Sequence, residues 1–558
     1  MNAIFSAIYE APGKDRSEVR GIIGDTPHPD DASRHGAQVN SRSSPAGSAA
    51  VRKLLQQYRA RIEHARVYDV AAISALDHAA KLSQRLGNRV LFKREDQQSV
   101  YSFKLRGAYN KIAQLTAAQR ARGVVTASAG NHAQGVALAA QHLGLAAHIV
   151  MPRTTPALKV ESVRALGGKA ILHGDAYDDA REHAEQLVRE KGWTMVHPYD
   201  DPDVIAGQGT IGLELMQQCA NLDAVFVPVG GGGLLAGVAA AIKSANPKIK
   251  VIAVEPDDSN CFAAALKAGR RVVLPQVGLF ADGVAVRQIG EETFRVARHL
   301  VDGAIQVSVD EICAATRDIF YDKRALPEPA GALAVAGLKR WVHENGAREQ
   351  TLAAIISGAN VNFDRLRHIA ERAELGDDAE ALLAVTLPEK PGAYRAFVRH
   401  LGRRAVTEFN YRYAAGSQAH VFVGLKLAGG AEEHDALVGG LRERGYAVID
   451  LRGDEMAKDH VRFMVGGRCP GLPNERLFRF EFPERPGALA DFLQAIGARW
   501  NISLFHYRNN GAANGRVLCG MQIAKKEWAE ARRAFDELGY EYAEETDNPA
   551  YRLFLGTD

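Results

Sequence analysis

The sequence has few cysteines and no long apolar run, and both absences narrow the class of protein. Its five cysteines in 558 residues are Cys219, Cys261, Cys313, Cys469 and Cys519. They are far apart and form no CxxC pair, so we expect neither a disulfide framework nor a zinc cluster. We expect the protein to lie in a reducing compartment. No window approaches 18 uninterrupted apolar residues, and the N-terminus lacks a signal-peptide pattern. We therefore expect a cytoplasmic protein with no membrane partner.

The sequence also lacks an excess of one charge. Lys and Arg number 69 and Asp and Glu number 66, which leaves a formal net charge of +3. This balance gives no electrostatic reason to expect a nucleic acid as the main partner. A chain of 558 residues is long enough for three or four domains, and a small-molecule enzyme fits these properties best.

The composition changes twice along the chain. Residues 1–50 carry Pro, Ser, Gly and scattered charge without a period, which predicts a disordered or irregular N-terminal extension. From there to residue 375, fully apolar runs such as AVFVPV alternate with amphipathic helical stretches. That alternation is typical of parallel sheets covered by helices on both faces, so we place an α/β catalytic core at 51–375.

The C-terminal part contains an internal repeat. LPEKPGA at 387–393 recurs as FPERPGA at 482–488, and FNYR at 409–412 recurs as FHYR at 505–508. Each copy reads strand, turn, helix, strand, strand, helix, the pattern of a small α+β regulatory domain that binds an amino acid. We place these domains at 381–453 and 477–549. A duplicated oligomerisation module without a ligand is the alternative.

The segment SFKLRGAYN contains the first candidate catalytic residue, Lys104. Ser102 is a good N-cap, which places Lys104 in the first turn of an amphipathic helix. The positive end of the helix dipole and partial burial both disfavour the ammonium form and lower the pKa toward the neutral amine that a Schiff base requires. Alone, a helical lysine is more often a solvated surface residue.

Three further loops follow apolar strands, so their residues are expected at the carboxyl edges of the sheets. SAGNH at 128–132 would place backbone N–H groups around an anion, GGGGL at 230–234 would enclose a phosphate, and SGAN at 357–360 would supply a hydroxyl. The glycine loop is neither GxGxxG nor a P-loop, which favours the phosphate of a small cofactor over a nucleotide. The alternatives are an ordinary turn, a flexible glycine turn and an N-capping serine, respectively.

With these loops in place, the sequence resembles the tryptophan synthase β-like (fold type II) family of pyridoxal phosphate enzymes, and within it the biosynthetic threonine deaminases. SFKLRGA, SAGNHAQG, GGGGL, EPAGAL and SGAN occur in the family order, and the C-terminal NPAYRLFLG and the repeat look like its regulatory part. The resemblance implies an α/β fold type II core of two open parallel-sheet subdomains, followed by two α+β ACT-like domains.

The resemblance also assigns roles to residues. Lys104 would hold pyridoxal 5′-phosphate covalently and remove the substrate's Cα proton, Phe103 would stack near the ring, and Ser357 would face the ring nitrogen. Asn131 would bind the phenolic oxygen, and Ser128, Gly130 and Asn131 would hold the substrate carboxylate. The phosphate would lie against Gly230, Gly231, Gly232, Gly233 and Leu234.

The implied reaction is deamination of L-threonine, with L-serine as a second substrate, to 2-oxobutanoate and ammonia as the first step of isoleucine biosynthesis. A homotetramer, inhibition by isoleucine and relief by valine are implied too. The core alone would equally suit a catabolic threonine/serine dehydratase or a serine racemase, and the repeat favours the biosynthetic enzyme. An amino-acid-sensing protein without activity is disfavoured by Lys104.

Two smaller predictions concern effectors and metal. Tyr411, Arg412, His506 and Tyr507 occupy equivalent places in the two copies and could bind an effector amino acid, although a packed sheet face is an equal alternative. Some relatives bind a metal through a Glu followed six residues later by an Asp. Here Glu255 is followed by Ser259 and Cys261, so we predict no such metal site.

Overall fold

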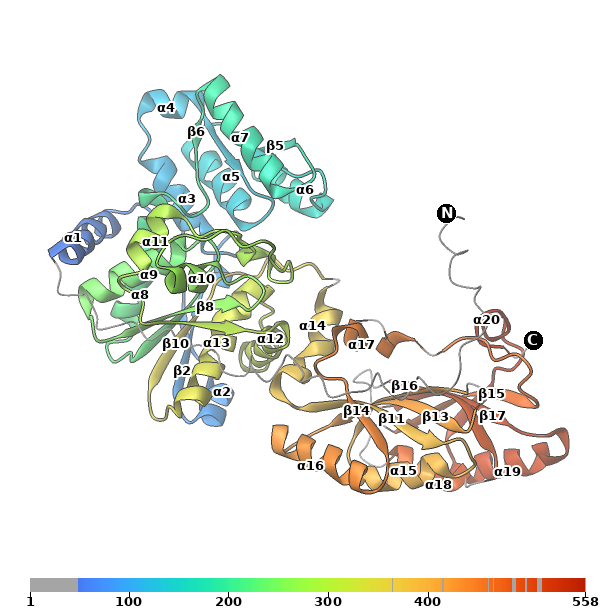
Figure 1. The fold of residues 1–558 in the computed structure, drawn as a ribbon. Coiled ribbons are helices and arrows are strands. Elements are labelled where there is room, and N and C mark those ends of the chain that lie inside the picture. Colours follow the sequence, from blue (N-terminus) through green and yellow to red (C-terminus); the bar gives the residue numbers. More distant parts are fainter. Residues whose placement is uncertain are drawn as a thin grey trace, which may run out of the picture.

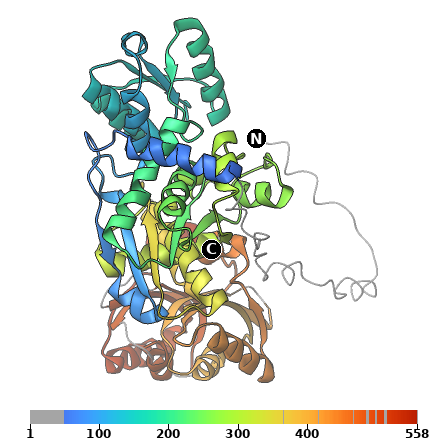
Figure 2. The same ribbon diagram turned by 90° about the vertical axis from the view of Figure 1, so that its left-hand side faces the viewer.

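The computed structural model describes residues 49–556, apart from 364, 414–415, 460, 465, 484–487, 497–498 and 509–513. The predicted N-terminal extension therefore lies outside the described residues, except that residues 49 and 50 open the first helix, α1 (Ala49–Glu63). Seen from the side, the molecule shows three tiers: an upper one in cyan and teal, a middle one that combines blue with green and yellow segments, and a lower one in orange and red (Figure 2).

The middle tier is built on a six-stranded sheet with the order β1-β2-β10-β7-β8-β9. All neighbouring strands are parallel except β1 and β2, which are antiparallel. The strands are β1 (Leu76–His78), β2 (Arg89–Arg94), β7 (Ala224–Pro228), β8 (Lys250–Pro256), β9 (Gly303–Val307) and β10 (Thr351–Ile356). The helices, besides α1, are α2 (Ala80–Leu86), α8 (Pro202–Gln218), α9 (Gly233–Ala245), α10 (Cys261–Ala268), α11 (Glu291–Ala297), α12 (Val309–Lys323) and α13 (Pro329–Asn345).

Both faces of this sheet are buried, as the apolar strands predicted. Val225 and Val227 of β7 belong to one core with α1, α8 and α9, whereas Ala224 and Phe226 belong to a second core with α12 and α13. Successive side chains of a strand point to opposite faces, so a strand between two helix layers must be apolar throughout. The antiparallel edge strand β1 was not predicted.

The upper tier carries a four-stranded parallel sheet with the order β5-β4-β3-β6. Its strands are β3 (Val124–Ala127), β4 (Ala147–Met151), β5 (Lys169–Leu172) and β6 (Thr194–Met195). Its helices are α3 (Lys104–Ala113), α4 (Ala117–Arg122), α5 (Asn131–Leu143), α6 (Ala157–Ala165) and α7 (Tyr177–Lys191). The predicted two parallel-sheet subdomains are thus confirmed, and α3 leads from one into the other.

Two copies of a βαββαβ unit form the lower tier, after α14 (Arg365–Ala373) and a short 3-10 turn, η6 (Leu375–Asp377). The first copy consists of β11 (Glu380–Pro388), α15 (Ala393–Leu401), β12 (Val406–Arg412), β13 (Gln418–Lys426), α16 (Gly430–Glu443) and β14 (Ala447–Asp450). The second consists of β15 (Glu475–Pro483), α18 (Ala488–Ile496), β16 (Asn501–Arg508), β17 (Asn514–Gln522), α19 (Trp528–Leu538) and β18 (Glu541–Glu544).

The two copies share one sheet, a feature that the repeat alone did not predict. The eight strands run β14-β11-β13-β12-β16-β17-β15-β18, and the central contact is the antiparallel pair β12–β16. Without this pair, each copy would expose the unpaired N–H and C=O groups of an edge strand. Figure 1 shows α15, α16, α18 and α19 along one face of the sheet, and α17 (Glu455–Asp459) and α20 (Pro549–Phe554) on the other.

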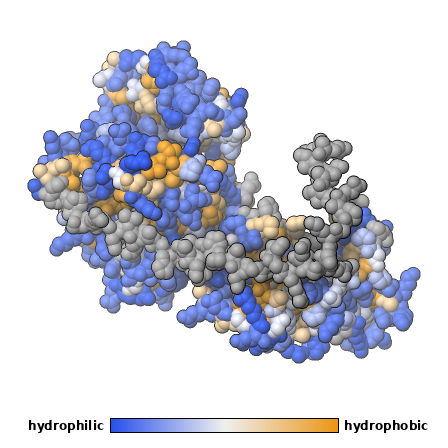
Figure 3. Space-filling model, viewed as in Figure 1, coloured by the Kyte–Doolittle hydropathy of each residue, from blue (hydrophilic) through white to orange (hydrophobic). Residues whose placement is uncertain are grey.

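Within the described ranges, no helix is both long and apolar enough to cross a lipid bilayer. The face seen in Figure 3 is mostly hydrophilic, with hydrophobic residues confined to small groups.

Candidate active site

Lys104 is the first residue of α3, and its turn is tied to the loop that follows β10. Ser102 forms an isolated antiparallel bridge with Gly358, and the N–H of Phe103 donates to the carbonyl of Ser357 at 3.2 Å. The hydroxyl of Ser102 accepts from the N–H of Lys104 at 3.3 Å, which agrees with its predicted capping role, although Phe103 occupies the cap position itself. Lys104 and Ser357 are thereby brought to one place from 253 residues apart in the sequence.

The Lys104 amine is partly buried and forms no hydrogen bond or ion pair with the described residues. Burial lowers its pKa, and the nearby carboxyl groups of Glu328 and Asp282 oppose this shift in part. The predicted shift toward the neutral amine therefore has a physical cause in the structure. An amine of this kind is suited to nucleophilic attack on a carbonyl group.

The glycine loop lies between β7 and α9 and presents free backbone donors. No described residue accepts a hydrogen bond from the N–H groups of residues 230–233. Gly232 has a φ of +92°, and a Cβ on Gly231 would lie 2.2 Å from the ring of Tyr199, so these two positions require glycine. Leu234 follows in the first turn of α9 and is buried. Unpaired N–H groups at the start of a helix form an anion site.

The loop from Ser128 to Asn131 borders open space. A Cβ on Gly130 would meet no atom within 4 Å, and the Ser128 hydroxyl accepts from the N–H of Gly130 at 3.3 Å. Asn131 begins α5 and is only 8% exposed. The loop therefore combines a hydroxyl, a flexible backbone position and a buried amide beside an unfilled volume, which suits a small carboxylate ligand.

Ser357 ends the apolar run of β10 and is buried. Its hydroxyl donates to the carbonyl of Ala330 at 3.2 Å, in the first turn of α13. The glycine loop approaches the same place: a Cβ on Gly230 would lie 2.9 Å from Val284, and one on Gly283 would lie 2.9 Å from Ala330. The three loops and the Lys104 turn therefore converge.

Glu328 is a residue of this site to which the sequence analysis assigned no role. Its carboxyl accepts from Nδ2 of Asn131 at 2.6 Å and is 5% exposed. Burial raises its pKa to about 7, and the negative charge of Asp282 adds to the shift. The EPAGAL segment was recognised only as a family motif, and its charged first residue, before an otherwise apolar helix start, was the signal available.

These groups fit pyridoxal phosphate. A neutral amine can form a Schiff base with its aldehyde, free N–H groups can bind its phosphate, and a buried hydroxyl can meet its ring nitrogen. Phe103, which precedes Lys104, is partly buried and packs against the core of the middle tier. The individual roles of these side chains stay predictions.

Glu255 has a different task from the metal ligand of some relatives. Its carboxyl accepts from the N–H groups of Phe262 and Ala263 at 2.8 and 2.9 Å and so stabilises the start of α10. The Cys261 thiol donates to the carbonyl of Gly230 at 3.4 Å. The described residues contain no group of three or more His, Cys, Asp or Glu that could hold a metal ion. The prediction of no metal site here remains a prediction.

The four candidate effector residues lie in the pair β12–β16 but on opposite faces of the sheet. Tyr411 opposes Phe505, and Tyr507 opposes Phe409, all four in the core beneath the helices. Side chains alternate along a strand, so Arg412 and His506 lie on the other face. No single ligand on one face of the sheet can therefore contact all four side chains.

Arg412 already has partners. Its guanidinium forms an ion pair with the buried Glu475 and donates to the carbonyl of Leu555 at 2.6 Å. Tyr411, in contrast, donates its hydroxyl to Glu389, which also accepts from Asn501 of the second copy at 3.0 Å. The tyrosine thus lies where the two copies meet.

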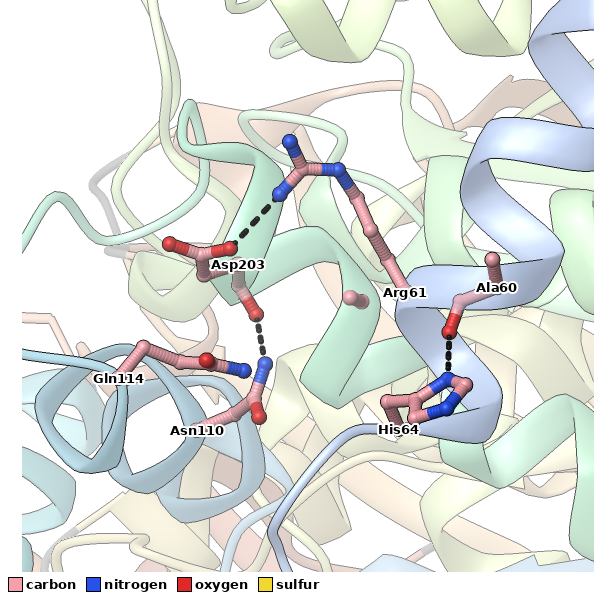
Figure 4. A pocket seen from close by; sticks show the side chains of 7 residues that line it. Ala60, Arg61, His64, Asn110, Gln114 and Asp203 are labelled. Atoms are coloured by element: carbon pink, nitrogen blue, oxygen red, sulfur yellow. Dashed lines mark hydrogen bonds and ion pairs between the residues drawn. The ribbon is translucent and has the colours of Figure 1, made fainter.

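A separate pocket of about 290 Å³ lies between α1, α3 and α8. Figure 4 shows its side chains, with Arg61 paired to Asp203 at 2.8 Å and Asn110 donating to the Asp203 carbonyl. None of the predicted site residues lines this pocket.

Two family models match the chain. The model "Pyridoxal-phosphate dependent enzyme" matches residues 70–358, and the model "C-terminal regulatory domain of Threonine dehydratase" matches residues 371–461 and 466–555. The first match includes the Lys104 turn and the three site loops as far as Gly358. The two matches of the second coincide with the two copies of the repeat.

Full-length relatives give the same result. The chain is 53% identical to L-threonine dehydratase biosynthetic IlvA of Pasteurella multocida, over 89% of this chain and 97% of the relative, and 54% identical to that of Escherichia coli with the same coverage. Among solved structures, processed threonine deaminase isoform 2 of Solanum lycopersicum is 48% identical with a TM-score of 0.57, covering 57% of this chain and 94% of that chain. Maize serine racemase is 34% identical with a TM-score of 0.52, covering 57% and 95%.

The fold, the converging loops and these matches agree, and they make pyridoxal phosphate the cofactor. The chain belongs to the family of pyridoxal-phosphate-dependent biosynthetic threonine dehydratases.

Proposed function

We propose that this protein deaminates L-threonine to 2-oxobutanoate and ammonia as the first step of isoleucine biosynthesis, and that L-serine is a second substrate. The observation that carries the proposal is the Lys104 amine, whose pKa is lowered by burial, in a turn that is hydrogen-bonded to the Ser357 loop, in a chain whose relatives are biosynthetic threonine dehydratases. Serine racemase, at 34% identity, is the second candidate because it shares the core.

The bound cofactor supplies an electron sink for the electrons that remain when the Cα–H bond breaks. Lys104 removes the Cα proton through its neutral amine, which burial favours. Ser128, Gly130 and Asn131 hold the substrate carboxylate against the open space at Gly130 and so fix the Cα–H bond toward the amine. The N–H groups of residues 230–233 hold the phosphate without a side-chain charge.

The proposal is tested by measuring 2-oxobutanoate and ammonia released from L-threonine, together with racemisation of L-serine. We expect stoichiometric 2-oxobutanoate and ammonia and little D-serine. If the protein racemises L-serine faster than it deaminates L-threonine, its function is that of a serine racemase.

Ser357 should affect cofactor retention more than turnover. Removal of its hydroxyl in Ser357→Ala deletes one neutral hydrogen bond, which contributes about 0.5–1.5 kcal/mol, so the cofactor dissociation constant should rise about 3- to 10-fold while kcat changes little. Ser357→Asp should slow deamination because a carboxylate would hold the ring nitrogen protonated. Ser308→Ala, at the N-cap of α12, is the control, since it removes a capping hydroxyl away from the site. An unchanged dissociation constant in Ser357→Ala would contradict the role.

We infer that isoleucine inhibits this enzyme and that valine relieves the inhibition. The proposal is supported by the two regulatory-domain matches and by Tyr411 at the junction of the copies. Because Arg412 is paired with Glu475 on the other face, Tyr411 and Tyr507 are better effector candidates than Arg412 and His506. Inhibition requires that isoleucine bind the inactive state more tightly than the active one.

Tyr411→Phe tests this assignment because it keeps the ring and removes only the hydroxyl that donates to Glu389. In the proposed role the hydroxyl also binds a charged end of isoleucine, and losing such a bond costs about 1.5–3 kcal/mol, so the isoleucine concentration for half inhibition should rise about tenfold or more without a change in uninhibited kcat. Tyr446→Phe is the matched control, because its hydroxyl contacts His400 at 3.0 Å near the surface, away from Glu389. If isoleucine inhibits both variants as it inhibits the unmodified enzyme, Tyr411 only packs in the core and does not bind the effector.

We also infer that the domains lie at 51–375, 381–453 and 477–549. The support is that η6 and β11 meet at residues 377–380 and that β15 begins at Glu475. The homotetramer rests on the resemblance, and sedimentation of the purified enzyme would test it. The cytoplasmic location stays an expectation from the sequence.

A further inference from the structure

Asn131 lies in a chain of hydrogen bonds whose direction is fixed. Nδ2 of Asn360 donates to the carbonyl of Val100 at 2.9 Å and to Oδ1 of Asn131 at 2.6 Å. Nδ2 of Asn131 then donates to Oε1 of Glu328 at 2.6 Å. A carbonyl can only accept, so Val100 sets the orientation of the Asn360 amide, and Asn360 sets that of Asn131.

Among the described residues, the carboxyl of Glu328 has one hydrogen-bond partner, the amide of Asn131. Glu328 is the N-cap residue of α13, yet its side chain makes no capping bond, and its backbone N–H donates to the carbonyl of Gly358 at 3.1 Å. A Cβ on Gly358 would lie 2.8 Å from Oε1 and 3.3 Å from Nδ2 of Asn131. The carboxyl and the amide are therefore packed together against a glycine that leaves room for both.

Charged groups from three other elements face Glu328. They are Lys104 of α3, Asp282 of the 3-10 turn η5 (Asp282–Val284), and Lys159 of α6, which pairs with Asp282 at 3.0 Å. Since burial raises the pKa of Glu328 to about 7, the group is mostly ionised at pH 8. A carboxylate is a stronger acceptor than a neutral oxygen, so it holds the Asn131 amide firmly at that pH.

We propose that Glu328 is a positioning residue of the cofactor site: together with Asn360 it fixes the amide of Asn131, so that the second N–H of Nδ2 stays available to the cofactor. The proposal rests on the cofactor-binding role proposed for Asn131. Glu328 acts through Asn131, and we assign it no contact with the substrate.

The test uses the full-length apoenzyme at pH 8 and 4′-deoxypyridoxine 5′-phosphate, which lacks the aldehyde and cannot react with Lys104. Its dissociation constant is measured for the unmodified chain, Glu328→Ala, Glu328→Gln, Asn131→Ala and Glu328→Ala/Asn131→Ala. We expect Glu328→Ala to weaken binding about tenfold, which is the effect of losing one charge-assisted hydrogen bond. Glu328→Gln, which keeps an acceptor oxygen, should recover most of the loss.

The decisive result is the double variant. If Glu328 acts through Asn131, Glu328→Ala has less than a twofold effect once Asn131 is alanine. The proposal would be overturned if Glu328→Ala weakened analogue binding equally with asparagine or alanine at residue 131, or if Glu328→Gln bound the analogue as weakly as Glu328→Ala. Either result would indicate a direct or purely electrostatic effect of Glu328. If Asn131→Ala binds the analogue normally, the role of Asn131 is wrong and the proposal falls with it, whereas the threonine assay tests the proposed reaction separately.

Two further variants guard against a folding artefact. Asn360→Ala removes the support on the other side of Asn131 and should show the same dependence on Asn131. Asp282→Asn removes a carboxylate that also faces Glu328 but pairs with Lys159 rather than Asn131, so its effect should be equal in both backgrounds. Thermal unfolding of each apoenzyme confirms that the variant is folded. If Asn360→Ala weakens binding of the analogue equally whether residue 131 is asparagine or alanine, the proposal is contradicted.

Discussion

Lys104→Ala is expected to lower threonine deamination by about 10³-fold or more while leaving a folded protein that still binds pyridoxal phosphate non-covalently. The reason is that Lys104 alone supplies the amine for both the covalent bond and the proton transfer. The free N–H groups of residues 230–233 and the amide of Asn131 do not depend on it. Rate assays and the visible absorbance of the covalently bound cofactor measure the two effects.

Lys111→Ala is the matched control for this prediction. Lys111 lies on the same helix, but its amine pairs with Asp201 at 2.8 Å and Asp203 at 3.2 Å. It should therefore keep the absorbance and most of the activity. Substantial deamination by Lys104→Ala, or an equal loss in Lys111→Ala, would contradict the assignment of Lys104.

Arg106→Met is expected to destabilise the core by about 3–5 kcal/mol, because it leaves buried carboxylates without their partner. Arg106 lies two residues after Lys104 and is fully buried. Its guanidinium pairs with Glu95 at 2.8 Å and with Glu214 at 2.6 Å, and Lys93 completes the cluster at 2.6 Å from Glu214. The four side chains are 0% exposed and carry no net charge together, so removing one cation leaves one uncompensated negative charge.

The loss should appear as a fall in the melting temperature on the order of 10 °C, measured by thermal unfolding of the apoenzyme. Arg59→Met is the control, since Arg59 forms an exposed pair with Glu63 one turn along α1 and should change stability by no more than about 0.5 kcal/mol. Similar melting temperatures for the two variants would show that the cluster is dispensable. The same cluster anchors α3, so Arg106→Met should also raise the cofactor dissociation constant.

The site loops could be predicted from the sequence because each follows an apolar strand. SAGNH follows β3, GGGGL follows β7 and SGAN follows β10, and parallel strands bring their carboxyl ends to one edge of a sheet. Strand, turn and helix each leave a local pattern of apolar residues, glycine and capping residues. The repeat is likewise local, and the βαββαβ order of both copies was confirmed.

The sequence by itself thus determined the two parallel sheets, the loops that surround Lys104 and the two regulatory units. Only the tertiary structure decided that Glu328 contacts Asn131 across 197 residues, that β12 pairs with β16, and that Arg412 pairs with Glu475 of the second copy. The reason is physical. Local patterns report whether a residue is buried, whereas the partner of a buried polar group depends on the way in which elements far apart in the sequence pack against one another. Neither the partner of a buried carboxyl nor the strand that pairs with an edge strand leaves a signal in the neighbouring residues, so these contacts arise only when the chain is folded.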